Sequence, residues 1–303
     1  MEKIKLLERI KELYDNGENI IEYLKGQNGN KETKLEDIMI SYDFQAGNYT
    51  RKAISIPDFR KEFCVNLASI LKELGPIESI LEIGVGEATT LGILLHQMEQ
   101  VPNDVFGFDI SWSRIKYAKQ FVQHLGLNDK TNINLCTGDL FSAPFADSSI
   151  DVVYTAHSLE PNGGKEQEAL EELYRIAKRY VVLLEPAFEL ADDKAKERML
   201  KHGYVTKLRA TADNLGYKVI AHRLFHPTSN PLNPTGLMII KKENAGNNPA
   251  AFACPVTKEI LALVKGVYFS KKALLAYPII DKIPCLLAQN AIVATHFLGK
   301  DIL

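Results

Sequence analysis

The segment from Ile80 to Thr90 (Ile-Leu-Glu-Ile-Gly-Val-Gly-Glu-Ala-Thr-Thr) constrains the fold of this chain more than any other feature. An apolar run that carries Glu82 is followed by Gly84 and Gly86, and then by residues typical of a helix start. Glycines in such a turn allow unusual backbone angles and let a ligand lie against the main chain. Many nucleotide-binding folds share this pattern, so alone it predicts a strand, a tight turn and a helix.

Short apolar runs and helical patterns alternate between residues 78 and 184. The runs fall at 79–83, 104–109, 132–136, 150–155 and 180–184, and the helical patterns fall near 88–98, 112–125 and 166–177. Such alternation predicts a parallel sheet with helices on both faces. Two further runs, 217–225 and 235–241, are separated by a proline-rich turn and are expected to form an antiparallel pair at the end of the sheet. The predicted fold class is α/β, with a doubly wound, mostly parallel seven-stranded sheet.

The flanking regions predict three parts. Residues 1–57 are expected to be a helical extension and a lid, residues 58–245 the sheet domain, and residues 250–303 a small α+β domain. A helix is expected from Asp58 to a stop at Gly75-Pro76, and another over 192–215. A loop is expected at 26–30 and a linker at 242–249.

Composition limits the class of protein. The chain has 303 residues, 46% of them hydrophobic, and a formal net charge of −2, so no global charge drives it toward nucleic acid or membrane. The four cysteines are far apart in the sequence and form no Cys-x-x-Cys pair, which fits buried thiols in a reducing compartment. The charged N-terminus is not a signal peptide, and no run of about 18 apolar residues exists. A cytoplasmic protein is expected.

Acidic residues stand near the ends of three successive runs, as Glu82, Asp109 and Asp139. Parallel strands end at one edge of a sheet, where α/β folds bind their ligands. A ligand site at this edge is therefore predicted. The alternative is structural: Asp109 and Asp139 would cap helices, and the glycines would only shape a turn.

Four motifs in order resemble those of the class I S-adenosylmethionine-dependent methyltransferases (type 11-like). They are Leu81-Glu-Ile-Gly-Val-Gly86, Phe108-Asp109, Gly138-Asp139-Leu140 and Asp151-Val-Val-Tyr-Thr-Ala-His-Ser-Leu-Glu160. The resemblance covers roughly residues 40 to 240. It implies a Rossmann-like methyltransferase fold that uses S-adenosylmethionine, releases S-adenosylhomocysteine and needs no metal.

The resemblance also implies roles at the donor. Gly84 and Gly86 would allow close backbone approach, and Asp109 would accept the ribose hydroxyls. Asp139 and the backbone of Leu140 would contact adenine. The other residues expected at the cofactor are Glu82 near the ammonium group, Ile110 and Trp112 over the base, Thr155 on the fourth strand, and the lid residues Tyr42 and Tyr49. The alternatives are packing for Trp112 and an ordinary aromatic loop for the lid.

The acceptor side follows the fourth strand, where His157 and Glu160 are the candidate catalytic residues. Histidine is the natural general base near neutral pH. The alternative is that His157 orients its loop. Glu185-Pro186 would line the acceptor pocket or form a structural turn. The Asn/Asp-Pro-Pro-Tyr pattern of many nucleic-acid amino-group methyltransferases is missing.

The C-terminal part resembles the zinc-ribbon-like activator subunit of tRNA and release-factor methyltransferases. The matching pieces are Cys254-Pro-Val-Thr257 and Tyr277-Pro-Ile-Ile-Asp-Lys-Ile-Pro284. Thr257 stands where a second Cys would be, and a tetrahedral zinc site normally needs four N or S ligands, so a metal-free version is expected. Its expected role is to cover the catalytic domain, shape the acceptor site or mediate association, without a separate activator.

These observations predict a methyltransferase that acts on a small molecule or biosynthetic intermediate. One alternative is methylation of RNA or of a translation protein, which the near-neutral charge disfavours. Another is a non-catalytic S-adenosylmethionine-binding or assembly protein. The expected partner is a small-molecule acceptor, with no nucleic acid and no membrane, and a homodimer is left open.

Overall fold

The structure, a computed structural model, describes residues 2–18, 20–27, 35–56, 58, 60–228, 230–243, 246 and 248–299. Residues 28–30 of the predicted loop lie outside this described part. So do residues 244, 245 and 247 of the predicted linker. The positions of the proposed domain boundaries therefore stay predictions.

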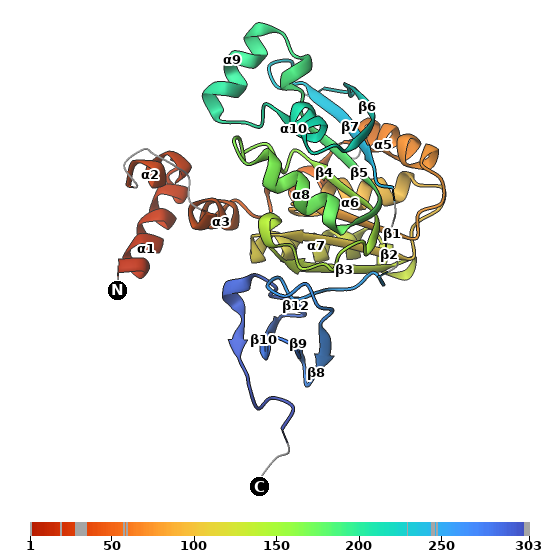
Figure 1. Cartoon of the computed structure of the whole chain (residues 1–303). Helices are drawn as coiled ribbons and strands as arrows, with labels where there is room; N and C mark the ends of the chain where they lie inside the picture. The colour runs from red at the N-terminus through yellow and green to blue at the C-terminus, as the bar shows by residue number, and fades with distance from the viewer. Residues whose placement is uncertain are drawn as a thin grey trace.

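A seven-stranded sheet forms the centre of the molecule (Figure 1), with the strand order β3-β2-β1-β4-β5-β7-β6. Its strands are β1 Ser79–Ile83, β2 Asp104–Asp109, β3 Asn132–Thr137, β4 Ile150–Ala156, β5 Ala177–Pro186, β6 Lys218–Leu224 and β7 Thr235–Lys241. The first five run parallel, and β7 pairs antiparallel with both β5 and β6. The predicted mostly parallel sheet and the antiparallel pair at its end are confirmed.

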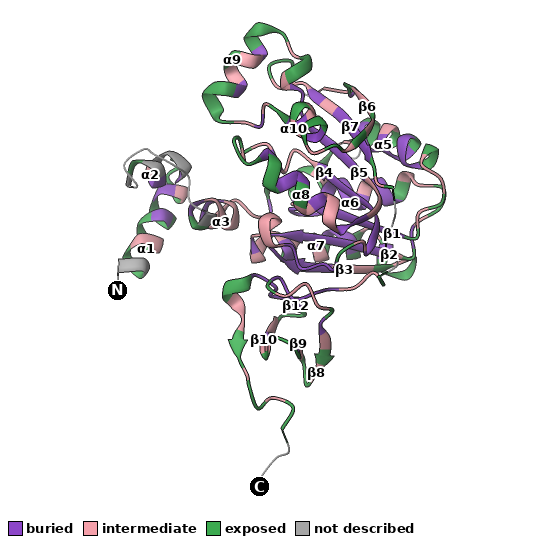
Figure 2. Cartoon of the chain, in the orientation of Figure 1, coloured by how far each residue is buried: buried purple, intermediate pink, exposed green. Residues whose placement is uncertain are grey.

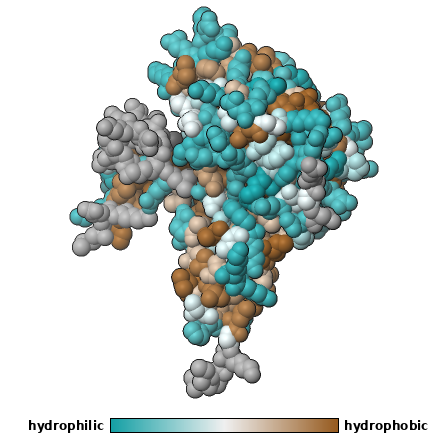
Figure 3. All heavy atoms as spheres, viewed as in Figure 1, coloured by the Kyte–Doolittle hydropathy of each residue, from teal (hydrophilic) through white to brown (hydrophobic). Residues whose placement is uncertain are grey.

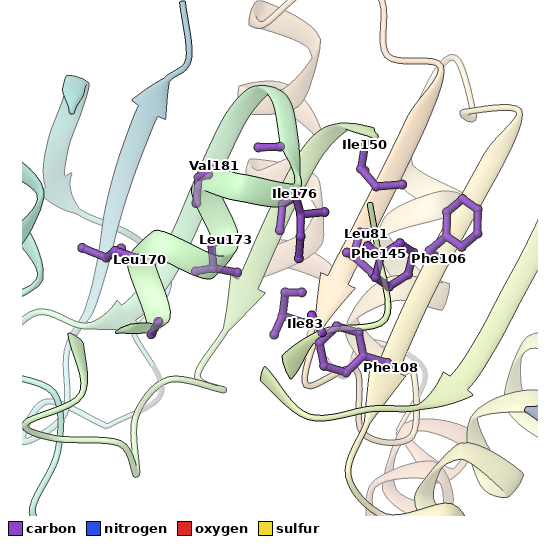
Figure 4. Close-up of a cluster of buried hydrophobic side chains, with 14 of the residues drawn as sticks. Leu81, Ile83, Phe106, Phe108, Phe145, Ile150, Leu170, Leu173, Ile176 and Val181 are labelled. Carbon is purple, nitrogen blue, oxygen red and sulfur yellow. The ribbon is translucent and has the colours of Figure 1, made fainter. Parts of the chain in front are cut away.

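Helices cover both faces of the sheet because alternate residues of each strand point to opposite faces. On one face, α8 (Glu166–Ile176) and α10 (Leu208–Asn214) pack on a cluster that includes Leu81 and Val153. Figure 4 shows part of this cluster, which includes Phe106 and Phe108 from β2 and Leu170, Leu173 and Ile176 from α8. On the other face, α5 (Lys61–Glu73), α6 (Thr89–Gln97) and α7 (Trp112–His124) pack on a cluster with Ile80 and Val152. The central strands β1, β2, β4 and β5 between these layers are mostly buried (Figure 2), whereas the edge strand β6 is not.

Two helix predictions were wrong in their bounds. The helix expected from Asp58 begins at Lys61, because Arg60 before it takes a left-handed conformation with φ 56°. The helix expected over 192–215 is two helices, α9 (Asp193–His202) and α10, separated at Gly203. Gly203 has φ 70° and provides a left-handed C-cap, which ends α9.

The N-terminal region is helical, as expected. Helices α1 (Glu2–Asp15), α2 (Ile20–Gln27) and α3 (Leu35–Phe44) share a small core of their own, around Ile10, Leu24 and Ile40. Figure 1 shows α1 and α2 beside the main body rather than over the sheet. Residues 41–56 form the end of α3, a turn and then α4 (Asn48–Ser55).

The described part of the C-terminal unit, residues 248–299, consists of short strands and a 3-10 helix. The strands are β8 Ala262–Val264, β9 Val267–Ser270, β10 Leu275–Tyr277, β11 Ile279–Ile280, β12 Ile283–Pro284 and β13 Ile292–Val293, and the 3-10 helix η4 is Ala288–Asn290. The chain just after β12 lies beside β3 (Figure 1), where Cys285 forms a parallel bridge to Thr137. Hydrophobic side chains gather on the surface of this unit (Figure 3). Its exposed hydrophobic residues include Val256, Leu263 and Ile280.

Candidate functional site

The turn after β1 has the backbone that its two glycines permit. Gly84 and Gly86 have φ values of 64° and 54°, in the left-handed region that disfavours other residues. A Cβ at Gly84 would lie 2.4 Å from the Cβ of Ser158, so only glycine fits against the loop that follows β4. The glycine pattern therefore serves both turn geometry and close packing of two loops at the same edge of the sheet.

A cavity of about 330 Å³ opens at this edge, over the carboxyl ends of β1 to β4. It is lined by residues that follow four strands and by side chains from α3, α4 and α7. The lining residues are Ile38, Tyr42, Gln45, Tyr49, Ile83, Gly84, Phe108, Asp109, Ile110, Arg114, Gly138, Asp139, Leu140, Phe141, His157, Ser158, Glu160, Pro161 and Asn162. The ligand edge predicted from the strand pattern is thus hollowed, and it brings together nine of the predicted site residues.

Asp109 ends β2 and joins two turns. Its Oδ2 accepts a hydrogen bond from the Gly86 N–H at 3.0 Å, and its Oδ1 accepts one from the Ser111 N–H at 2.9 Å. Burial raises the pKa of this carboxyl, while the Arg114 guanidinium and the backbone N–H groups act in the opposite direction. The N-cap of α7 is Ser111, not Asp109. Since a carboxylate offers about four lone-pair sites, Asp109 retains acceptor capacity toward the cavity.

Asp139 follows β3 and does cap a short element, as its structural alternative proposed. Its Oδ1 accepts from the Phe141 N–H at 3.1 Å, at the start of the 3-10 helix η2 (Leu140–Ser142). Burial raises the pKa of Asp139. Asp139 and Leu140 also line the cavity, so capping and ligand contact are compatible at this residue.

Helices α3 and α4 cover one side of the cavity and are fastened by two carboxylates. Glu87, in the turn after β1, accepts hydrogen bonds from the N–H groups of Gly47 at 3.0 Å and Thr50 at 2.7 Å, at the N-terminus of α4. Asp43, near the end of α3, accepts from the Ser113 N–H at 2.9 Å and the Ser111 hydroxyl at 2.8 Å, at the N-terminus of α7. Glu87 of the sheet domain thus accepts at the N-terminus of the cover helix α4, and Asp43 of the cover accepts at the N-terminus of α7, where a negative charge is favourable. The resulting cover places Tyr42 and Tyr49 over the cavity, where the lid was predicted.

His157 has both ring nitrogens engaged. Nδ1 lies 2.8 Å from Glu160 Oε2, and Nε2 lies 2.8 Å from the Thr235 hydroxyl. Burial raises the pKa of Glu160, but hydrogen bonds from His157, Tyr204 and Asn233 outweigh it and hold this pKa below its ordinary value. A proton from an acceptor could reach Nε2 only if the Thr235 hydroxyl turned away.

Glu185, at the end of β5, binds the backbone of the loop that follows β4. Its carboxylate accepts three backbone hydrogen bonds of 3.0–3.1 Å, from Ser158, Leu159 and Glu160. Burial raises the pKa of Glu185 to about 7. Neither Glu185 nor Pro186 lines the cavity, so the structural alternative describes this pair.

Four predicted cofactor residues lie outside the cavity lining: Glu82, Gly86, Trp112 and Thr155. Glu82 is buried behind the glycine turn and accepts a 2.7 Å hydrogen bond from the Tyr154 hydroxyl. Burial raises its pKa to about 8. Trp112 packs against the second core cluster, and Thr155 is fully buried on β4.

Sequence reasoning missed Asp43, Glu87 and Arg114. Asp43 and Glu87 act through backbone partners that are distant in sequence, so no local spacing identifies them. Arg114 is a cation placed by α7 at the cavity. The sequence signal for Arg114 was its position five residues after Asp109, which ends a strand, in the first turn of the helix that follows.

Within the described residues, no group of three or more His, Cys, Asp or Glu side chains could hold a metal ion. The four cysteines are free and buried. No helix in the described part of the chain is long and apolar enough to cross a membrane.

One family model matches part of the chain. Residues 80–179 match a family model described as a methyltransferase domain. No curated protein matches the chain in sequence.

Similar solved structures include a SAM-dependent methyltransferase from Aquifex aeolicus (19% identity, 63% of this chain and 95% of that chain, TM-score 0.44). Magnesium protoporphyrin IX methyltransferase from Synechocystis PCC 6803 with bound SAH is similar at 13% identity over 74% of this chain and 98% of that chain, with a TM-score of 0.47. A chain from the complex of the Haloferax volcanii Trm112 methyltransferase activator with a candidate methyltransferase is similar at 14% identity, over 66% of this chain and 96% of that chain, with a TM-score of 0.46.

At TM-scores below 0.5 these likenesses do not define the fold, which rests on the strand order of the chain itself. The family match covers β1 to the start of β5, and therefore contains the glycine turn, Asp109 and Asp139. The comparisons thus show that residues 80–179 are similar to a methyltransferase domain.

Proposed function

We propose that the chain transfers a methyl group from S-adenosylmethionine to a small-molecule acceptor in the cavity over β1 to β4. The observation that carries the proposal is the convergence of Gly84, Asp109 and Asp139 on one cavity under a helical cover. The cofactor supplies an activated methyl group on a sulfonium sulfur, and transfer is a single displacement in which the acceptor loses a proton. The chain then has to orient two molecules and exclude water, which can supply much of the rate.

The residues fit the cofactor in the order of the strands. Leu140 and Asp139 on the β3 side would contact adenine, and Asp109 after β2 would accept the ribose hydroxyls. The Gly84 turn lets the methionine part lie against the backbone. The Ser158 hydroxyl, on a residue that lines the cavity, is buried and has no hydrogen-bond partner among the described residues. An unsatisfied buried hydroxyl is costly, so a bound ligand is the natural partner.

A small acceptor fits the geometry better than a macromolecule. Tyr42, Gln45 and Tyr49 lie over the cavity on a cover held by Glu87 and Asp43. The cavity volume of about 330 Å³ lies at the lower end of the range for small-ligand sites, about 300–1,000 Å³, and the donor must share it, so little room remains for a large acceptor. An RNA or protein acceptor would have to insert its reactive group beneath these helices.

We infer that His157 positions Glu160 rather than serving as the general base, because both of its ring nitrogens are occupied. His157→Asn keeps a hydrogen-bond donor toward Glu160 and is expected to lower kcat less than about tenfold. Loss of a general base would cost about 10²–10⁴-fold. A loss in that higher range, with unchanged cofactor affinity, would restore the general-base assignment.

We propose that the C-terminal unit, which resembles a methyltransferase activator, braces the adenine loop of its own chain. The Leu286 N–H donates to the Thr137 carbonyl at 3.1 Å, just before Gly138 and Asp139. The Ser142 hydroxyl donates to the Pro255 carbonyl at 2.9 Å, and Lys258 Nζ donates to the Ala143 carbonyl at 3.1 Å. Contacts on both sides of residues 138–141 would hold the cavity wall that they form.

Lys258→Met tests this brace. The substitution removes the hydrogen bond to Ala143 and the 2.9 Å ion pair with Glu172. We expect a several-fold loss of cofactor affinity, measured by calorimetry, while Lys271→Met on the exposed surface of the same unit leaves the affinity unchanged. Equal affinities for the two variants would contradict the brace.

The activity itself is tested with methyl-labelled S-adenosylmethionine. The purified chain is incubated with a small-molecule extract, with total RNA and with protein, and Asp109→Ala serves as the control for each. Label transferred only to small molecules, and lost in the control, supports the proposal. Label in RNA or protein contradicts the small-molecule assignment. Cofactor binding without any transfer across a wide range of acceptors would favour a binding or assembly protein.

A further inference from the structure

Arg114 reaches back from the first turn of α7 to the glycine turn. Its Nε donates to the Tyr42 carbonyl at 3.3 Å, and its Cζ lies 4.2 Å from the centre of the Tyr42 ring and 5.8 Å from that of Tyr49. Its Nη1 lies 3.7 Å from the place that a Cβ on Gly86 would take. These contacts fix the guanidinium between the aromatic cover and the turn.

Among the described residues, the outer nitrogens of this guanidinium have no hydrogen-bond partner: its one hydrogen bond is the one from Nε to Tyr42. Arginine has five N–H donors, and the hydrogen bond to Tyr42 uses one of them. In the regions described, no carboxylate lies within ion-pair distance (4.0 Å) of Arg114, although Asp109 is close enough to interact electrostatically. A positioned guanidinium at a cavity matches a carboxylate, which it can bind through two parallel hydrogen bonds.

We propose that Arg114 binds the carboxylate of the amino-acid tail of the methyl donor. This inference rests on the proposed function. The strand order supports this assignment to the amino-acid tail of the donor. The residues after β3 would contact the adenine, and Asp109 after β2 would contact the ribose. The next strand in the sheet is β1. The tail then lies over the β1 turn, where Nη1 stands beside Gly86.

The acceptor lies on the other side of that turn. The acceptor-side residues His157, Glu160 and Asn162 follow β4, the neighbour of β1 away from β2. An anion bound by Arg114 is therefore on the donor side. Because Tyr42 and Tyr49 belong to the cover, the position of the Arg114 guanidinium also depends on where α3 and α4 lie.

The test compares two donors that differ only in the carboxylate. Affinities of S-adenosylmethionine and of decarboxylated S-adenosylmethionine are measured by calorimetry for the wild type and for Arg114→Met. In the wild type, we expect the carboxylate to strengthen binding by roughly 10–100-fold. In Arg114→Met, S-adenosylmethionine should lose about that factor, whereas the decarboxylated ligand should change less than about twofold.

Two further variants complete the design. Arg114→Lys retains the positive charge but loses the planar guanidinium that can form two parallel hydrogen bonds. Its affinity for S-adenosylmethionine should therefore lie between those of the wild type and Arg114→Met. Lys116→Met removes an exposed positive charge from the same helix and should bind both ligands as the wild type does. These variants distinguish a local contact from a general effect of charge.

Three results would overturn the inference. Equal losses for both ligands in Arg114→Met and Arg114→Lys would make Arg114 a structural residue. Unchanged affinity of Arg114→Met for S-adenosylmethionine would show that Arg114 does not hold the donor's carboxylate. No binding of either ligand to the wild type at millimolar concentration would contradict the proposed function, and the inference with it.

Discussion

Replacing Gly84 with alanine tests the close packing of the two loops that form the donor site. The residue has φ 64°, and an added Cβ would lie 2.4 Å from Ser158 Cβ and 3.2 Å from its hydroxyl. The left-handed backbone costs a non-glycine residue about 1–2 kcal/mol. Forcing the β4 loop away, so that this contact exceeds 3.0 Å, adds an overpacking cost of about 1–3 kcal/mol. The free energy of unfolding should therefore fall by about 2–5 kcal/mol, out of about 5–15 kcal/mol typical of a domain.

Gly126→Ala is the matched control. Gly126 has φ 63°, and nothing lies within 4 Å of an added Cβ, so this variant carries the backbone strain without the collision. It should lose only about 1–2 kcal/mol of stability and bind S-adenosylmethionine as the wild type does. Because Ser158 lines the cavity, Gly84→Ala should also weaken donor binding by about tenfold or more. Urea unfolding and calorimetry measure both quantities. Equal stability losses in the two variants, with equal donor affinities, would refute the packing argument.

Two further predictions concern buried carboxylates. Burial raises the pKa of Glu82 to about 8, whereas the same carboxyl in an unfolded chain has a pKa of about 4.3. Between these two pH values the folded state binds more protons than the unfolded state. The free energy of unfolding therefore falls as the pH rises from about 4.3 to about 8. This decline is on the order of a few kcal/mol, and Glu82→Gln should flatten it. Urea unfolding of both proteins from about pH 5 to 8 measures the free energy of unfolding. An equal pH dependence in the wild type and the variant would contradict the prediction. Glu87→Gln places an amide N–H₂ group among the N–H groups of Gly47 and Thr50, so it should loosen α4. We expect faster proteolysis of the segment 45–56 and about a threefold to tenfold loss of donor affinity; an unchanged cleavage rate would show that Glu87 does not fasten the cover.

The sheet could be predicted from the sequence because its strands are short apolar runs separated by helical patterns. Strands β1, β2 and β7 begin and end where the runs do, since each run is bounded by polar or turn residues. The break at Gly203 was missed, because a single glycine inside a charged helical pattern is compatible with a continuous helix. The start of α5 was missed because no sequence rule places Arg60 in a left-handed conformation.

From the residues alone, the site could be predicted where a strand end determines the position of a side chain; the lid residues Tyr42 and Tyr49 came from the family resemblance. Gly84, Asp109 and Asp139 were found in this way, and all three line the cavity. The fastening of the cover depends on contacts between residues about 40 and 70 positions apart, from Glu87 to α4 and from Asp43 to α7, which leave no local pattern. Glu82 stands near the end of β1 but faces Tyr154, because alternate residues of a strand point to opposite faces.

Calorimetric titration of S-adenosylmethionine and S-adenosylhomocysteine into the wild type and Asp109→Ala tests the central claim most directly. The account predicts binding of both ligands to the wild type in about the micromolar range, and a loss of at least about tenfold in the variant. Asp109 also joins the Gly86 and Ser111 turns, so the variant must first be shown to be folded by circular dichroism. No wild-type binding at millimolar ligand, or unchanged affinity in a folded Asp109→Ala variant, would contradict the assignment of the donor site.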